Sequence, residues 1–301
     1  MAKLKPITGT EYFLWKYLPS IPLAAAFLAA FLIVTTIHLT LTIRTKTHFN
    51  HILAIGGLMQ VLGYAARIWA HFSTDTIPPY IMQSCLIILA PVLYAASVYM
   101  CLSRIIRSSG GERLSLVRPR WITRVFVLAD FATLNVQGNG AGLTGSDTKA
   151  VARAGQWIVI AGLGIQVATV GFFVLVAVVW HRRMGRWVRA EERMEVELVN
   201  DGQAMGDGSM EGQSMPSELP PWRTGLWMLY ICSALIGVRS VFRLVEYVQG
   251  PEGYLLSREW PTYSLDGSLM LLLQIVYVIW FPKDFKVEMS DRRKKWMRLL
   301  K

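Results

Sequence analysis

Polar and charged side chains recur at helical spacing inside long apolar stretches of this sequence. Residues at positions i, i+4 and i+7 share one face of an α-helix, so each set is expected to form a single stripe. Ionisable groups are costly in hydrocarbon, and such stripes usually face the interior of a helix bundle or a wet cavity. The stripes are Gln60, Tyr64 and Arg67; Arg239, Arg243 and Glu246; and Asp130 with Gln137.

The depths of these residues predict one polar network in the outer half of a helix bundle. At 1.5 Å per residue, Asp266 lies about 9 Å from the outer end of its span, Arg239 about 14 Å and Arg67 about 6 Å. Three arginines would face three carboxylates, which makes the network nearly neutral. Its expected members are Arg67, Arg239, Arg243, Glu246, Asp266 and the deeper Asp130, with Glu259 joining from a loop.

Two interpretations of this network remain open. In the first, its residues pair with one another, stabilise the contacts between helices and bind nothing. In the second, they line an amphipathic cavity that opens to the outer leaflet and takes a polar or charged head group. Asp130 and Gln137 would form the floor of that cavity. Asp130 is then the candidate proton carrier, because a buried carboxylate favours its neutral form unless an arginine holds it ionised.

The elements that position these residues are predicted to be transmembrane helices. The chain has 301 residues, of which 53% are hydrophobic and 17% charged, whereas about a quarter of a soluble domain is charged. Its apolar residues form blocks of roughly 20, the length that crosses hydrocarbon. We predict an all-α, polytopic membrane protein, a seven-transmembrane-helix bundle. The expected spans are about 18–43, 51–71, 79–106, 121–143, 154–181, 225–248 and 260–281, the fourth being the weakest because of its polar residues.

The distribution of positive charge predicts that the N-terminus is extracellular and the C-terminus cytosolic. The outer segments then hold six Lys and Arg residues and the inner segments 21, as the positive-inside rule requires. This orientation gives an extracellular N-terminus (1–17), a transmembrane domain (18–281) with a flexible cytosolic loop (200–221), and a basic cytosolic tail (282–301). The tail either stops translocation or lies as a helix on the anionic cytosolic leaflet.

The residue types that an enzyme or a cofactor would need do not gather in the sequence. The five histidines divide between opposite faces and the interior of the first span, which argues against a zinc hydrolase. A phosphate-binding loop of the G-x-x-x-x-G-K-Ser/Thr type is absent. We therefore expect no enzyme activity, no metal and no cofactor. Because the basic residues lie between apolar blocks, we also expect no nucleic acid partner; the oligomeric state stays open.

Four runs of sequence resemble one known family. They are LGYAAR (62–67), LAPVLYAASVYMCLSRII (89–106), VLADFATLNVQGNGAGL (127–143) and RSVFRLVEYVQGPEGYLLSREWPTYSLDG (239–267). In this order they resemble the fungal lipid-translocating exporters, or RTA-like seven-transmembrane proteins, over most of the chain. The most specific positions are Arg239, Phe242, Arg243, Glu246, Gly250, Gly253, Glu259, Tyr263 and Asp266. One position departs: the family usually has a glutamate where this chain has Gln60.

The resemblance implies a fungal plasma-membrane protein that exports or flips lipids and other amphiphiles, such as sphingoid bases or sterol-like toxic compounds. Some members of the family are linked to porphyrin or haem traffic. Without an ATP site, movement would be downhill or coupled to an ion gradient. The alternative is a seven-helix receptor or sensor for lipid or drug stress, which signals through the inner loop and tail. The expected substrate-binding residues are Gln60, Tyr64, Arg67, Asp130, Gln137, Arg239, Arg243, Glu246, Glu259, Tyr263 and Asp266.

Overall fold

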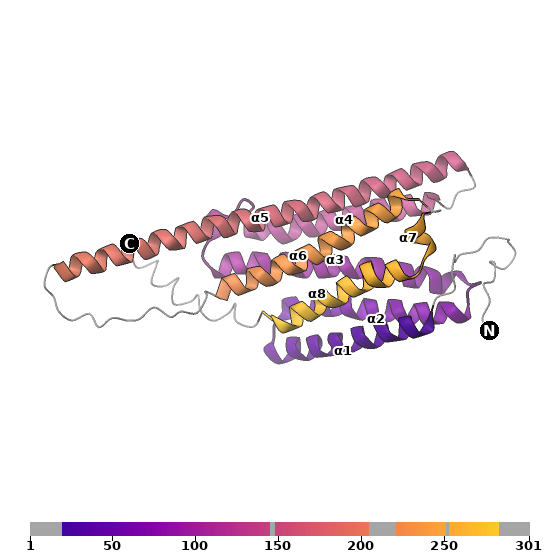
Figure 1. Cartoon of the computed structure of the whole chain (residues 1–301), viewed down its shortest axis with the longest axis horizontal. Helices are drawn as coiled ribbons and strands as arrows, with labels where there is room; N and C mark the ends of the chain where they lie inside the picture. The colour runs from indigo at the N-terminus through magenta and orange to yellow at the C-terminus, as the bar shows by residue number, and fades with distance from the viewer. Residues whose placement is uncertain (1–19, 145–147, 205–220, 251–252, 283–301) are drawn as a thin grey trace.

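The computed structural model describes residues 20–144, 148–204, 221–250 and 253–282, and these residues form a bundle of helices (Figure 1). The expected extracellular segment 1–17, most of the expected loop 200–221 and the tail from residue 283 lie outside the described residues. The long helices are α1 (Ile21–Thr45), α2 (His51–Phe72), α3 (Ile77–Ser108), α4 (Pro119–Thr144), α5 (Lys149–Ala204), α6 (Pro221–Val248) and α8 (Ser268–Ile279). Shorter turns are η1 (His48–Asn50), η2 (Glu112–Leu114), α7 (Tyr254–Ser257) and η3 (Thr262–Gly267).

These helices confirm the all-α polytopic bundle. Among the described residues, six helical segments are long and apolar enough to cross a membrane. The remaining long helix, α4, has 26 residues, or about 39 Å of length, and packs lengthwise between α3 and α5 (Figure 1). It corresponds to the fourth of the seven predicted spans, and that it crosses the membrane stays a prediction. Helix α1 begins and α8 ends at opposite ends of the bundle (Figure 1), as expected of an odd number of spans. The extracellular placement of the start stays a prediction.

The helices pack as a ring in chain order, which α8 closes by contacting α1, and α3 also reaches across to α6. Helix α3 is the most buried of the six apolar segments. In its most apolar stretch of 18 residues, 67% is buried, against 22% for α1. The outward side chains of α1, among them Ile33 and Ile43, are exposed and apolar, as a lipid-facing surface requires. On α3 the polar side chains Gln83, Ser97 and Ser103 are buried in the protein.

Helix α5 is longer than its predicted span, and it corrects the expected start of the inner loop. Its 56 residues reach about 84 Å, far beyond the hydrocarbon thickness of about 30 Å, and it extends past the other helices (Figure 1). Residues 200–204, which were expected in the flexible loop, are helical. The reason is the composition of 182–199, which is rich in Arg, Glu and Met and contains no proline, so that the helix propagates beyond the membrane.

Glycines hold α4 and α5 in backbone contact. A Cβ atom on Gly155 would lie 2.6 Å from the carbonyl oxygen of Gly140. Backbone atoms cannot move aside cheaply, so Gly155→Ala is expected to destabilise the protein by about 1–3 kcal/mol. The measurement is the midpoint of thermal unfolding in detergent. Gly164→Ala on the same helix is the control, because a Cβ there meets nothing within 4 Å; equal midpoints for the two variants would contradict this account.

Candidate functional site

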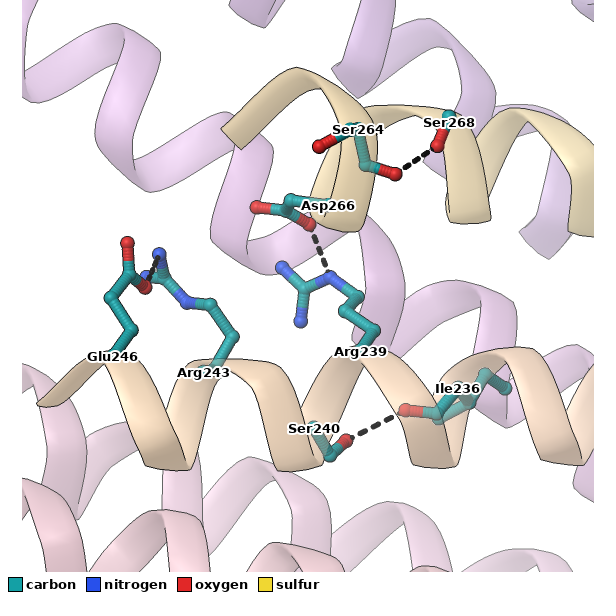
Figure 2. Close-up of polar contacts among 8 residues, drawn as sticks. All are labelled: Ile236, Arg239, Ser240, Arg243, Glu246, Ser264, Asp266 and Ser268. Carbon is teal, nitrogen blue, oxygen red and sulfur yellow. Dashed lines mark hydrogen bonds and ion pairs between the residues drawn. The ribbon is translucent and has the colours of Figure 1, made fainter. Parts of the chain in front are cut away.

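One buried ion pair connects α6 with the start of the last span, which η3 and α8 form, and a second lies within α6. The Nε of Arg239 donates to Oδ1 of Asp266 at 2.5 Å, and Nη1 of Arg243 donates to Oε2 of Glu246 at 2.8 Å. Figure 2 shows Arg239 and Asp266 pointing toward each other between the two helices, with Arg243 and Glu246 further along α6. Asp266 also interacts electrostatically with Arg243. The stripe predicted on α6 therefore faces the interior, and both of its arginines are paired.

The third ion pair lies where α2 ends and the last span begins, which is the outer side in the predicted orientation. Nη2 of Arg67 lies 3.0 Å from Oε1 of Glu259. Nε of Arg67 donates to the hydroxyl of Tyr263 at 2.9 Å. The guanidinium carbon of Arg67 also lies 4.9 Å from the centre of the Tyr263 ring, a cation–π contact. The backbone N–H of Ser20 donates to Glu259. The loop glutamate is thus the partner of Arg67.

A π-helical turn, η3, carries two of these residues. It contains both Tyr263 and Asp266, which are buried, and π turns inside helices are frequent at functional sites. Tyr64 of α2 stacks on the Tyr263 ring, with 6.0 Å between centroids. Its hydroxyl lies against Gly267, where any larger residue would collide with it. At the end of the turn Ser268 donates to the carbonyl of Ser264 (Figure 2).

We call the residues of the three ion pairs, together with Gln60, Tyr64 and Tyr263, the outer network. Two of its members, Gln60 and Arg239, have hydrogen-bonding atoms without a partner among the described residues. Gln60 is 1% exposed, and neither its Nε2 nor its Oε1 has a partner among the described residues; the same holds for Nη2 of Arg239. A buried polar group left unsatisfied costs about 1–3 kcal/mol, and such groups are normally satisfied by water or a ligand. Gln60 shares its helix face with Tyr64 and Arg67. The network therefore offers two donors and one acceptor to a polar group that enters it.

Asp130 and Gln137 lie against other partners, which corrects their expected place at the floor of the network. Oδ2 of Asp130 accepts a hydrogen bond from the hydroxyl of Tyr99 on α3 at 2.8 Å. Gln137 donates to Gln166 on α5 at 3.0 Å. Within the described part of the chain, neither side chain is bonded to an arginine of the network. The physical reason is the glycine contact between α4 and α5, which fixes the rotation of α4 about its axis.

A deeper polar layer was not anticipated from the sequence. Nε2 of Gln274 donates to Thr35 on α1 at 2.9 Å, and its Oε1 accepts from Tyr94 on α3 at 3.2 Å. A Cβ on Gly57 of α2 would touch both Thr35 and Gln274. The sequence feature that could have predicted this layer is the spacing of eight residues between Asp266 and Gln274, because that spacing places both side chains on one helix face. Together with Gln60, this layer extends the outer network toward the middle of the bundle.

Comparisons with known proteins place this chain in a family. The family model described as RTA1 like protein matches residues 53–288. Protein RTA1 of Saccharomyces cerevisiae is 30% identical over 75% of this chain and 63% of its own length, so the match covers less than two thirds of that relative. Protoporphyrin uptake protein 1 of Saccharomyces cerevisiae is 30% identical over 74% of this chain and 65% of its own length.

A further relative carries a name that describes lipid transport. Sphingoid long-chain base transporter RSB1 of Saccharomyces cerevisiae is 26% identical over 83% of this chain and 68% of its own length. No solved structure matches the chain. The family match covers well over half of the residues, from the start of α2 past the end of the last span. The chain is therefore a multi-pass membrane protein that belongs to the RTA1-like family, as its sequence motifs indicate.

Proposed function

We propose that this protein moves an amphiphile with a polar head, such as a sphingoid base, between the leaflets of the plasma membrane. One relative is named a sphingoid long-chain base transporter and another a protoporphyrin uptake protein, and both names describe amphiphilic cargo. The observation that carries the proposal is the buried outer network with unused atoms on Gln60 and Arg239. A polar head group is the kind of ligand that would satisfy them.

In this proposal the apolar tail stays in the bilayer while the head passes between α2, α6 and the last span. An ammonium head would replace an arginine at the carboxylate of Asp266 or Glu246, and a hydroxyl would bond to the amide of Gln60. Chemistry on the cargo is not required, so the proposed role is transport and not enzymatic. Coupling to a proton gradient would use Asp130, whose Oδ1 is buried and has no partner among the described residues.

Reconstitution into liposomes tests the proposal. A fluorescent sphingoid base is expected to change leaflet faster in the presence of the protein than in protein-free liposomes. Arg243→Ala is expected to abolish the acceleration, because it leaves Glu246 buried without its cation. Arg258→Ala is the control, since this exposed outer arginine lies over Tyr254 and outside the network. Unaccelerated flipping by folded protein, or equal loss in both variants, would contradict the proposal.

The second candidate function is a membrane sensor, and the length of α5 is the observation that favours it. A helix that continues about 35 Å past residue 181, at 1.5 Å per residue, connects the bundle to the cytosol as one rigid element. Deletion of residues 205–219 separates the two functions. A transporter should keep its flipping rate in liposomes after this deletion, whereas a sensor would lose the cellular response to lipid or drug stress.

A further inference from the structure

A pocket of about 460 Å³ lies between the start of α6 and the part of α5 from residue 178 to residue 189. From α5 it is lined by His181, Arg182 and Arg189, and from α6 by Arg223, Trp227 and Tyr230. Along α6, Tyr230 precedes Arg239 of the outer network by nine residues, or about 14 Å. The pocket is therefore a separate place in the bundle, near the cytosolic leaflet in the predicted orientation.

The lining of this pocket is cationic and includes no carboxylate. Neither 149–190 on α5 nor 221–245 on α6 contains an aspartate or a glutamate. Arg182 acts electrostatically on Tyr230, and Arg223 acts on His181, so these charges converge on the wall of the pocket. Such a field repels an ammonium head and attracts an anion. Arginine in particular binds phosphate oxygens through its planar fork of donors.

Aromatic and apolar groups border the cationic lining. The Tyr230 hydroxyl lies 3.0 Å from Nδ1 of His181, and the Trp227 ring meets the Tyr230 ring edge-on, with 6.2 Å between centroids. Trp227 is 62% exposed, and tryptophan is typical of the membrane interface. On α5, Val178 lines the pocket and Leu175, one turn deeper, is exposed. This arrangement suits a head group among the arginines and an acyl chain along α5.

We propose that this pocket binds the phosphate head group of an anionic lipid from the cytosolic leaflet. The inference goes beyond the proposed transport function, because the site is distinct from the outer network and takes the opposite charge from a sphingoid base. A lipid bound there bridges α5 to α6, the helix that carries Arg239 and Arg243. The amount of anionic lipid in the inner leaflet would then determine how often α6, which carries part of the outer network, is bridged to α5.

Binding of a short-chain lipid to the purified full-length protein tests this inference. Calorimetric titration in detergent is expected to show saturable binding of dioctanoyl phosphatidic acid. Dioctanoyl phosphatidylcholine and inorganic phosphate serve as comparison ligands, and both are expected to bind at least about tenfold more weakly. Inorganic phosphate that binds as tightly as phosphatidic acid would overturn the lipid assignment in favour of a free-phosphate site. Absence of phosphatidic acid binding by folded protein would overturn the lipid assignment.

Variants locate the binding in the pocket. Arg182→Gln is expected to weaken phosphatidic acid binding about tenfold, as loss of a charge-assisted hydrogen bond does. Arg186→Gln is the matched control. It removes an exposed arginine from the same helix, and Arg186 does not line the pocket. Equal weakening in the two variants would overturn the assignment in favour of a diffuse effect of charge.

Gly185 permits a second, independent variant. It lines the pocket, and a Cβ there meets nothing within 4 Å, so a side chain fits without disturbing the helices. Gly185→Glu places a carboxylate among the arginines and is expected to abolish binding; retained binding would overturn the placement. An acidic segment of this chain is the competing occupant. If phosphatidic acid binds only after Asp207→Asn, Glu211→Gln and Glu218→Gln are combined, that segment fills the pocket and the lipid assignment fails.

Discussion

Asp266→Asn is expected to lower the thermal unfolding midpoint more than any other single change in the outer network. The substitution leaves the guanidinium of Arg239, a residue that is 5% exposed, without its counter-charge. Removal of one partner from a buried ion pair costs about 3–5 kcal/mol. The midpoint is measured on purified protein in detergent, alongside the flipping rate in liposomes. Both quantities should fall.

Glu259→Gln provides the graded comparison for this prediction. Its side chain is 17% exposed, against 3% for that of Asp266, and water that reaches a charge reduces the cost of losing its partner. The fall in unfolding midpoint should therefore be clearly smaller than for Asp266→Asn. Equal falls would show that burial does not set the cost at these pairs.

A double variant separates stability from transport at the same pair. Arg239→Met combined with Asp266→Leu removes both charges, and apolar replacement of a buried ion pair is often neutral or stabilising. We expect the midpoint to recover at least in part while flipping stays lost, because the head group has no charged partner left. Normal flipping by the double variant would favour the other interpretation of the network, in which the pair only orients helices.

The sequence was sufficient to predict the helices and two of the three polar stripes. Long apolar blocks have few structural solutions in hydrocarbon, where the backbone must satisfy its own hydrogen bonds. The spacing of Arg239, Arg243 and Glu246 was equally informative, because the cost of exposing a charge to lipid turns that face inward. These inferences depend on one helix at a time, which is why a single sequence carries them.

The partners of Asp130 and Gln137 could not be predicted in the same way. Periodicity identifies residues that share a face, but not which neighbouring helix that face meets. On α4 the answer depends on the contact of Gly140 with Gly155, which rotates Asp130 toward Tyr99 and Gln137 toward Gln166. The spacing of polar residues on α4 alone does not predict the contact of Gly140 with Gly155.

The π turn at the start of the last span also escaped the sequence pattern. Helical periodicity assumes 3.6 residues per turn, and η3 inserts a wider turn between the loop that carries Glu259 and the regular helix α8. Asp266 was expected in the site from its depth in the span and Tyr263 from the family resemblance, yet their contacts with Arg239 and Arg67 depend on this local geometry. Close packing of Tyr64 against Gly267 holds the turn in place.

Gln60→Leu is expected to move stability and transport in opposite directions. Leucine has nearly the volume of glutamine, and it removes a buried amide that has no partner among the described residues. The gain should be about 1–3 kcal/mol, seen as a higher unfolding midpoint. Flipping of the sphingoid base should fall at least about tenfold, because the amide is the proposed partner of the head group. General damage to the fold cannot produce this combination.

Gln60→Glu introduces the glutamate that the family resemblance leads us to expect at this position, and it tests the effect of a carboxyl group there on flipping. A carboxyl group titrates and an amide does not, so the pH dependence of flipping should differ between the variant and the unmodified protein. The protonated carboxyl resembles the amide in shape and charge. The two proteins should therefore behave most alike at low pH, and they should diverge as the pH rises and the carboxylate forms beside Tyr64 and Arg67. Parallel pH profiles would contradict a direct role for residue 60, since a group in contact with the head group must report its own charge.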